Sequence, residues 1–254
     1  MGEQHGEQRL EPMPGDWQRA LAVVAHPDDL EYGAAAAVAE WTAQGKEIAY
    51  VLATRGEAGI DNLPPVECAR VREAEQRASA AAVGVTDLEF LDHPDGVIEE
   101  GPALRADIAR ALRRWRPELV ITANHHETWG SGPGAWRNTP DHRAVGRAAL
   151  DAIGDAGNRW IFADQLEEDG LMPWSGVRWA AVAASPYVTH AQAVGEEAVA
   201  AALASLNEHR AYISALTDED PQAYARTIVT GGLEMYGARF GGGNAVGFEL
   251  VPFS

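Results

Sequence analysis

The sequence predicts an α/β protein: a Rossmann-like three-layer sandwich with a mostly parallel sheet and an active site at the carboxyl ends of the strands. Short apolar runs alternate with helical segments through the first half of the chain, which favours a parallel sheet covered on both faces. The 254 residues, of which 46% are hydrophobic, are enough for one substantial domain. We expect residues 1–17 to form a flexible tail and residues 18–254 to form a single domain.

The hydrophobic pattern places the elements in order. In one expected helix, Leu104, Ile108 and Leu112 recur at helical spacing on one face. Another has His209 near its end, where a positive group complements the helix dipole. The Gly-rich residues 231–247 are expected to form a loop. The expected strands are 21–24, 48–53, 88–91, 119–122, two between 177 and 194, and 248–251, and the expected helices are 29–44, 64–83, 103–115, one beginning at 140, and 196–216.

Charge and cysteine content exclude several classes of partner. The chain has 38 acidic and 20 basic residues, and its net charge of -18 would repel phosphate backbones and anionic membranes. The single cysteine, Cys68, cannot form an internal disulfide and is expected to be an ordinary helix residue. Neither a signal peptide nor a membrane span is evident, so we expect a cytoplasmic protein without nucleic-acid or membrane partners. A homo-oligomer is compatible with the sequence.

A polar cluster follows the first buried strand directly, within the sequence AHPDDLE of residues 25–31. The turn from a strand into a helix can direct His26 and Asp29 at a common point, and both residue types are good zinc ligands. Asp28 lies between them and is free to act as a proton carrier. The alternative is an ordinary helix start, because Pro and Asp are also common in the first helical turn.

A second polar cluster follows residues 119–122 and a long polar loop, and it opens another helix with the sequence TPDH. Ligands gather at the carboxyl ends of parallel strands, so His142 can join His26 and Asp29 there. Three protein ligands with an open fourth position is the arrangement of a catalytic zinc, although another divalent transition metal is possible. Asp141 is a candidate for orienting an imidazole, but an Asp in the first helical turn would look identical.

These two clusters resemble the signature of the zinc-dependent de-N-acetylases of the LmbE or PIG-L type. That family has His-Pro-Asp-Asp-x-Glu after a strand, which is complete here at residues 26–31, and a later His-Pro-Asp-His, which is present as TPDH at residues 139–142. The resemblance covers nearly the whole chain after about residue 18.

The resemblance implies that zinc is bound by His26, Asp29 and His142, and that Asp28 is the general base. The second cluster departs from the family pattern at Thr139, where the family has a His that stabilises the developing oxyanion. Thr139 is therefore expected to be a helix N-cap before a proline, and another donor is expected to replace the missing imidazole.

The loop of residues 124–138 supplies candidates for that donor and for substrate binding in His125, His126 and Arg137. Long loops at the carboxyl end of a strand usually have a functional reason. The tryptophans of the loop, at positions 129 and 136, suit the apolar face of a sugar, or they only hold the loop against the domain.

Two further positions are substrate-binding candidates. Arg72 lies in an element that resembles the family's Arg-x-x-Glu, whose Arg can face the sugar; otherwise it forms a solvated ion pair with Glu75. Asp95 belongs to a His-Pro-Asp triplet followed by Gly, for which a turn is favoured over a second metal site. Asp95 or Asp92 can accept hydrogen bonds from substrate hydroxyl groups.

The resemblance implies a hydrolase that removes an N-acetyl or other acyl group from an amino sugar or a GlcNAc-containing conjugate. Zinc lowers the pKa of a bound water from about 15.7 to roughly 7, and Asp28 is then expected to take up its proton. Its partner is thus a small N-acetylated sugar or glycoconjugate. Two alternatives are a metal amidase acting on a larger conjugate, such as a thiol conjugate, and a non-catalytic metal-containing sugar-binding protein.

Overall fold

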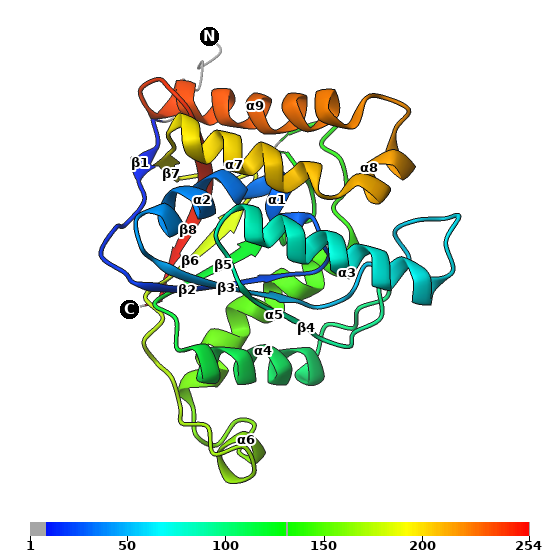
Figure 1. Ribbon diagram of the computed structural model, residues 1–254. Helices are drawn as coiled ribbons and strands as arrows, with labels where there is room; N and C mark the ends of the chain where they lie inside the picture. Colours follow the sequence, from blue (N-terminus) through cyan, green and yellow to red (C-terminus); the bar gives the residue numbers. More distant parts are fainter. Residues whose placement is uncertain (1–8, 131, 254) are drawn as a thin grey trace.

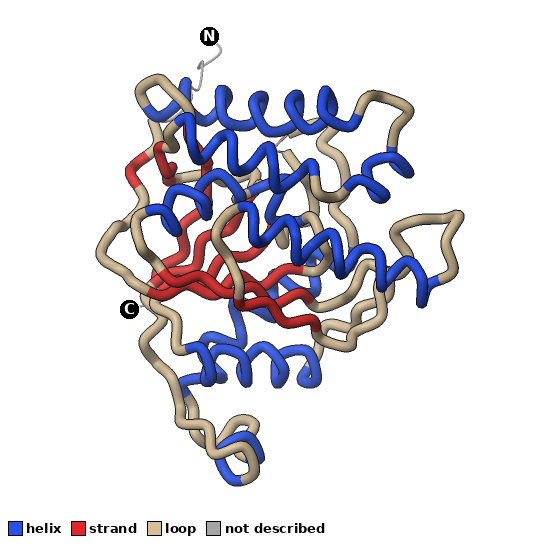
Figure 2. Tube along the Cα trace, viewed as in Figure 1, coloured by secondary structure: helices blue, strands red, loops and turns tan. Residues whose placement is uncertain are grey.

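The protein is represented by a computed structural model that describes residues 9–130 and 132–253. These residues form one sheet of eight strands in the order β1-β7-β8-β6-β5-β2-β3-β4, with helices on both faces (Figures 1 and 2). The strands are β1 (Glu11–Pro12), β2 (Arg19–Val24), β3 (Glu47–Leu52), β4 (Asp87–Phe90), β5 (Leu119–Ala123), β6 (Trp179–Ala183), β7 (His190–Ala193) and β8 (Ala245–Pro252).

The helices divide into two outer layers. Helices α2, α3, α7 and α9 lie on one side of the sheet in Figure 1, and α4 and α5 lie on the other. The three-layer sandwich predicted from the sequence is therefore confirmed. The helices are α1 (Asp29–Gly33), α2 (Ala35–Ala43), α3 (Pro65–Ala82), α4 (Pro102–Trp115), α5 (Pro140–Gly157), α6 (Asp164–Glu167), α7 (Glu196–Asn207), α8 (Arg210–Leu216) and α9 (Pro221–Phe240).

The sheet is mostly parallel, as predicted. Only β8 runs antiparallel to its neighbours, β6 and β7. In the centre, Ala22 of β2 is paired with Tyr50 of β3 and Ile121 of β5. Alternate residues of β2 belong to different cores, Ala22 to the one under α2 and α7, and Leu21 to the one under α4 and α5. Burial on both faces explains why this strand reads as a continuous apolar run.

The N-terminal segment differs from the prediction. Residues 9–17 are not a flexible tail: β1 pairs with β7, and Leu10, Met13 and Trp17 are buried. The three large apolar side chains, spaced along a polar stretch, fix this segment against the domain. Residues 1–8, the rest of the predicted tail, lie outside the described residues.

The C-terminal region also differs from the prediction, because α9 occupies much of the expected Gly-rich loop. The helix buries Val229 and Leu233, four residues apart, against the core. Gly237 is required by packing, since a Cβ there would lie 1.9 Å from the carbonyl oxygen of Gly243. The expected helix 196–216 is likewise interrupted at His209. Within the part of the chain that the structure describes, no helix has the length and apolar character to cross a membrane.

Candidate metal centre and active site

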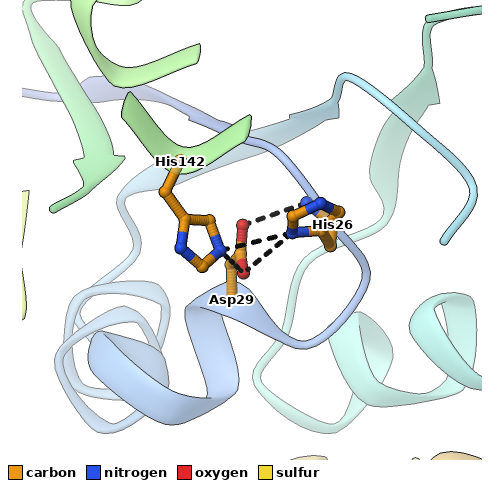
Figure 3. Close-up of side chains that lie close together, drawn as sticks. All are labelled: His26, Asp29 and His142. Carbon is orange, nitrogen blue, oxygen red and sulfur yellow. Dashed lines mark hydrogen bonds and ion pairs between the residues drawn. The ribbon is translucent and has the colours of Figure 1, made fainter. Parts of the chain in front are cut away.

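The turns after β2 and β5 bring three side chains together. These strands are neighbours and run parallel, so both end at the same edge of the sheet. His26 lies in the turn after β2, Asp29 begins α1, and His142 lies in the first turn of α5 (Figure 3). Asp29 Oδ1 is 3.0 Å from His142 Nε2 and 3.7 Å from His26 Nδ1, and the two ring nitrogens are 3.2 Å apart.

These three atoms fit a zinc ion. In a tetrahedral site with bonds of about 2.0–2.1 Å, neighbouring donor atoms are roughly 3.3 Å apart, close to the separations in the structure. Two imidazole nitrogens that face each other can share one proton at most, whereas a cation would use both lone pairs. The donor set of two imidazoles and one carboxylate also leaves a fourth position open, which is the pattern of a catalytic zinc.

In each imidazole, one ring nitrogen faces the position shared by the three donors. The other ring nitrogen contacts a separate partner. His26 Nε2 lies 3.2 Å from Asp141 Oδ2 and 3.1 Å from Asp95 Oδ1. His142 Nδ1 lies 3.0 Å from Asn138 Oδ1. An imidazole that donates to an oxygen through one nitrogen presents the lone pair of the other, and such partners commonly orient metal-binding histidines. Asp141 lies where a residue that orients an imidazole would lie, and this role stays a prediction.

A second group of possible ligands consists of His26, Asp95 and Asp141, and it shares only His26 with the first group. The Asp141 carboxylate already accepts backbone N–H groups from Gly96 at 2.7 Å and Ile98 at 3.2 Å. Asp95 accepts one from Ala58 at 2.8 Å. Because these carboxylates are anchored in this way beside the far nitrogen of His26, we interpret them as its orienting partners.

Backbone groups hold the carboxylate of Asp29 in place. Its Oδ2 accepts N–H groups from Ala25 and His26, both at 3.0 Å, which leaves Oδ1 for the shared point. Burial raises the pKa of Asp29, but His142 and His26 outweigh it and hold the pKa well below its usual range. The predicted N-cap is confirmed, because the Thr139 side chain accepts the backbone N–H of His142 at 3.2 Å.

Asp28 lies beside the three donors but belongs to neither group of possible ligands. It has a left-handed backbone conformation with φ 93°, and its Oδ2 is 3.0 Å from Arg72 Nη2. Burial raises the pKa of Asp28 to about 7, against the opposing charge of Arg72. A carboxyl group with a pKa near neutrality can both accept and donate a proton during turnover.

A cavity of about 830 Å³ opens over the three donors. Trp129, Trp136 and Leu216, all partly exposed, are among its lining residues, as is Tyr212. The Trp129 ring packs edge-on against that of His142, with 5.3 Å between centroids. This volume lies within the 300–1,000 Å³ range typical of ligand sites, and the wall combines aromatic rings with polar groups.

Arg72 and Asp95, two of the predicted substrate-binding residues, line this cavity. Arg72 is buried, however, and its guanidinium lies 3.7 Å over the ring of Tyr212 and donates to the carbonyl of Pro27. The alternative pair with Glu75 is wrong, because the carboxylate of Glu75 accepts the backbone N–H of Ala211. Arg72 thus lines the cavity, but its guanidinium pairs with the carboxylate of Asp28.

The structure does not bring the other three predicted residues to the cavity lining. His126 Nε2 contacts Glu249 at 2.6 Å, and the His125 ring packs on that of His126 with 4.2 Å between centroids. Arg137 is exposed near Glu127. The loop directs these side chains toward β8 or toward solvent. A donor for the oxyanion is therefore sought among the residues that line the cavity.

Several site residues have no signature in the sequence. Tyr212 and Tyr224 reach the cavity from α8 and α9, far along the chain, and Asn138 precedes the second polar cluster. Only Tyr32 could have been inferred, because it lies three residues after Asp29 and therefore on the same face of the helix.

Comparisons with known proteins identify the family. A sequence profile of the family described as PIG-L, GlcNAc-PI de-N-acetylase, matches residues 21–153. A 1D-myo-inositol 2-acetamido-2-deoxy-alpha-D-glucopyranoside deacetylase of Kineococcus radiotolerans is 30% identical over 194 residues, covering 62% of this chain and 49% of that protein. A diacetylchitobiose deacetylase of Thermococcus kodakarensis is 28% identical over 147 residues, covering 56% and 51%. The chain thus spans about half the length of the curated relatives it matches.

Solved structures share the fold. The N,N'-diacetylchitobiose deacetylase of Pyrococcus horikoshii superposes with a TM-score of 0.79 at 24% identity, over 93% of this chain and 85% of that one. The 4-carboxy-2-hydroxymuconate hydratase GalB of Pseudomonas putida superposes with a TM-score of 0.68 at 19% identity, over 92% and 96%. The fold therefore supports more than one chemistry, and the reaction has to be argued from the site.

Proposed function

The chain belongs to the PIG-L family of de-N-acetylases, and we propose that it is a zinc-dependent hydrolase that removes the N-acetyl group from an amino sugar or a GlcNAc-containing conjugate. The observation that carries this proposal is the convergence of His26, Asp29 and His142 at the floor of a large, partly aromatic cavity. The names of the sequence relatives, deacetylases of N-acetylated sugars, support it.

We assign the proton transfers to Asp28. A zinc ion held by His26, Asp29 and His142 would polarise the acyl oxygen and lower the pKa of a bound water. Asp28 then accepts the proton of the attacking water and returns it to the departing amine nitrogen. Arg72, 3.0 Å from its carboxylate, keeps it oriented toward the cavity.

The donor that stabilises the oxyanion differs from the family pattern, because Thr139 stands where the family has a His. We propose that hydroxyl groups on the cavity wall take this role, with Thr139, Tyr212 and Tyr224 as the candidates. The requirement is a donor directed at the position where negative charge develops.

The proposal is tested by amine release. Zinc-loaded protein is expected to release one amine and one acetate per turnover from N-acetylglucosamine, diacetylchitobiose or an N-acetylglucosaminyl inositol. A chelator should stop the reaction, and added zinc should restore it. If the loaded protein binds these sugars but releases no amine above the Asp28→Ala background, the enzyme proposal fails and the sugar-binding alternative stands.

The amidase alternative is tested by a direct comparison of acyl groups. Acetate release is compared with release of a bulkier acid from the same amino sugar. Faster release of the bulkier acid would favour the amidase over the deacetylase.

We predict that Trp136→Ala raises KM about 3- to 10-fold and changes kcat by less than twofold. Trp136 lines the cavity although its side chain is 81% exposed. We expect the loss of one ring contact to cost about as much as an aromatic pair, roughly 0.5–1.5 kcal/mol. Trp160 is also 81% exposed but does not line the cavity, so Trp160→Ala is the matched control. Unchanged KM in Trp136→Ala would mean that this ring only supports the loop.

We predict that Asp28 titrates near pH 7 in the metal-free protein, because burial raises its pKa. Added zinc should move the titration to lower pH, since a nearby dication favours the carboxylate form. The group is protonated below this pH, so kcat/KM should fall on the acid side. The carboxyl 13C shift of Asp28, assigned with Asp28→Asn, measures this, and a metal-free titration below pH 5 would contradict it.

A further inference from the structure

We propose that Gln76, Glu31 and His209 form a buried polar relay that positions Asp28 for proton transfer. These are positioning residues, since they act through Asp28 and do not line the floor of the cavity where the three donors converge. The proposal rests on the proposed function, because it concerns the residue to which that reaction assigns the proton.

Asp28 needs an external restraint. Its φ of 93° and ψ of -20° lie in the left-handed region, which is unfavourable for residues other than glycine and is often found at functional sites. The backbone N–H of Asp28 donates to Gln76 Oε1 at 2.8 Å, and this contact comes from α3, 48 residues away. The side-chain amide of Gln76 therefore holds the N–H side of this residue, whereas its carbonyl accepts the N–H groups of Glu31 at 2.9 Å and Tyr32 at 3.1 Å.

The amide of Gln76 is itself fixed in one orientation. An N–H group can only donate, so the oxygen of Gln76 must face Asp28, and its nitrogen donates to Glu31 Oε1 at 3.1 Å. The same Glu31 oxygen accepts from Ser79 at 2.6 Å, and the Ser79 and Ser205 hydroxyls are 2.7 Å apart. All of these side chains are buried, so each unmade bond would be costly.

His209 completes the relay from the junction of α7 and α8. Its side chain is fully buried, and Nε2 lies 3.7 Å from Glu31 Oε2. Burial lowers the pKa of His209, but Glu31 outweighs it, so the pKa lies above its ordinary value. A helix dipole is therefore not the explanation for His209. Three residues later, Tyr212 packs under the guanidinium of Arg72, so the junction also shapes the cavity wall.

A fully buried carboxylate and imidazole add little stability compared with apolar residues of the same volume. In this position Glu31 and His209 orient Gln76, and through it Asp28. The metal ligands have hydrogen-bond partners outside this relay. Asp29 is held by backbone N–H groups, and the far nitrogens of His26 and His142 contact Asp141 and Asn138.

This separation predicts a specific kinetic effect for Gln76→Met. Methionine keeps the volume but offers no amide, so the N–H of residue 28 loses its partner, one restraint on the left-handed conformation is removed, and the carboxylate shifts. We expect kcat to fall about 10- to 100-fold, because a misplacement of about 1 Å can cost a factor of 100. KM should stay within threefold, and zinc should remain at one per chain.

The matched control is Gln165→Met. Gln165 is also fully buried, and its amide bonds to Arg113 at 2.8 Å and to the carbonyl of Ala106 at 2.7 Å. It lies in α6, away from the site in Figure 1. We expect this variant to lower the melting temperature and to leave kcat unchanged. Glu31→Gln, which keeps an oxygen acceptor for Gln76, should retain kcat within about threefold.

Equal kcat values for Gln76→Met and Gln165→Met would overturn the proposal, as would a loss of zinc in Gln76→Met alone. If Gln76→Met does not fold, Ser79→Ala takes its place, with an expected three- to tenfold loss of kcat at unchanged KM. No loss of kcat in Ser79→Ala would overturn the proposal.

A crystal structure of the Gln76→Met variant is a readout without turnover. Residue 28 should leave φ near 93°, and a retained φ with its carboxylate beside Arg72 would contradict the relay. If wild-type protein with zinc releases no amine, the proposed function fails, whereas this structural readout still decides the relay.

Discussion

Replacing His142 or His26 by alanine should abolish zinc binding and lower kcat/KM about 1,000-fold or more. Each imidazole supplies one of only three protein donors, and the nitrogens face each other at 3.2 Å. With two donors left, the site no longer matches a catalytic zinc, and the activation of water that the metal supplies is lost with it. Zinc is measured by elemental analysis after dialysis, and activity by amine release.

His190→Ala is the control for these variants. His190 begins β7, near the edge of the sheet, and its ring contacts the hydroxyl of Thr189. Zinc content and kcat/KM should match wild type. One zinc per chain in both the His26→Ala and His142→Ala proteins would show that the ion is bound elsewhere.

Asp28→Asn should keep one zinc per chain and lower kcat about 100- to 10,000-fold, with KM changed less than threefold. The amide has the shape of the carboxyl group but cannot accept and return a proton, and general acid–base catalysis typically contributes a factor of this size. Since Asp28 is not among the three donors, zinc content should not change. Single-turnover kinetics separates this chemical step from substrate binding.

Asp155→Asn is the matched control, because Asp155 is also a buried carboxylate paired with an arginine, 2.8 Å from Arg105. It lies in the last turn of α5, and we expect its replacement to lower stability without changing kcat. If Asp28→Asn retained more than a tenth of the wild-type kcat, the proton carrier would be a different group, and Asp95 on the cavity wall would be the next candidate.

The parts of the site that are local in sequence could be predicted. His26, Asp28 and Asp29 follow a buried strand within five positions, and the same sequence pattern that ends the strand also begins the helix. His142 could be added because neighbouring parallel strands end at one edge of a sheet. Thr139 could be recognised as an N-cap from the proline that follows it.

The parts of the site that depend on packing between distant segments could not be predicted from the sequence. Nothing local distinguishes Gln76, in the middle of a charged helix, from a surface residue, and only the structure shows that it contacts Asp28. His209 lies where a helix dipole is a sufficient explanation, yet the chain bends there and buries the ring beside Glu31. Helix α9, which replaces part of the predicted Gly-rich loop, illustrates the same limit. Gly237 lies within this helix and is required there because the backbone of Gly243 approaches it closely.

The loop histidines do not line the cavity, for a related reason. His125 and His126 are near the site in sequence, but the direction of their side chains depends on Glu249 in β8, at the far end of the chain. A pattern of polar residues identifies a functional loop without saying which of its side chains face the cavity. The exposed Trp136 does line the cavity, and its neighbour Arg137 does not.

Anomalous diffraction at the zinc edge, from crystals of the zinc-loaded protein, locates the ion on which the proposed chemistry depends. One zinc should lie within about 2.0–2.2 Å of His26 Nδ1, Asp29 Oδ1 and His142 Nε2, with its fourth position facing the cavity. An anomalous peak elsewhere, or none among these three atoms in zinc-loaded crystals, would contradict the proposed hydrolysis.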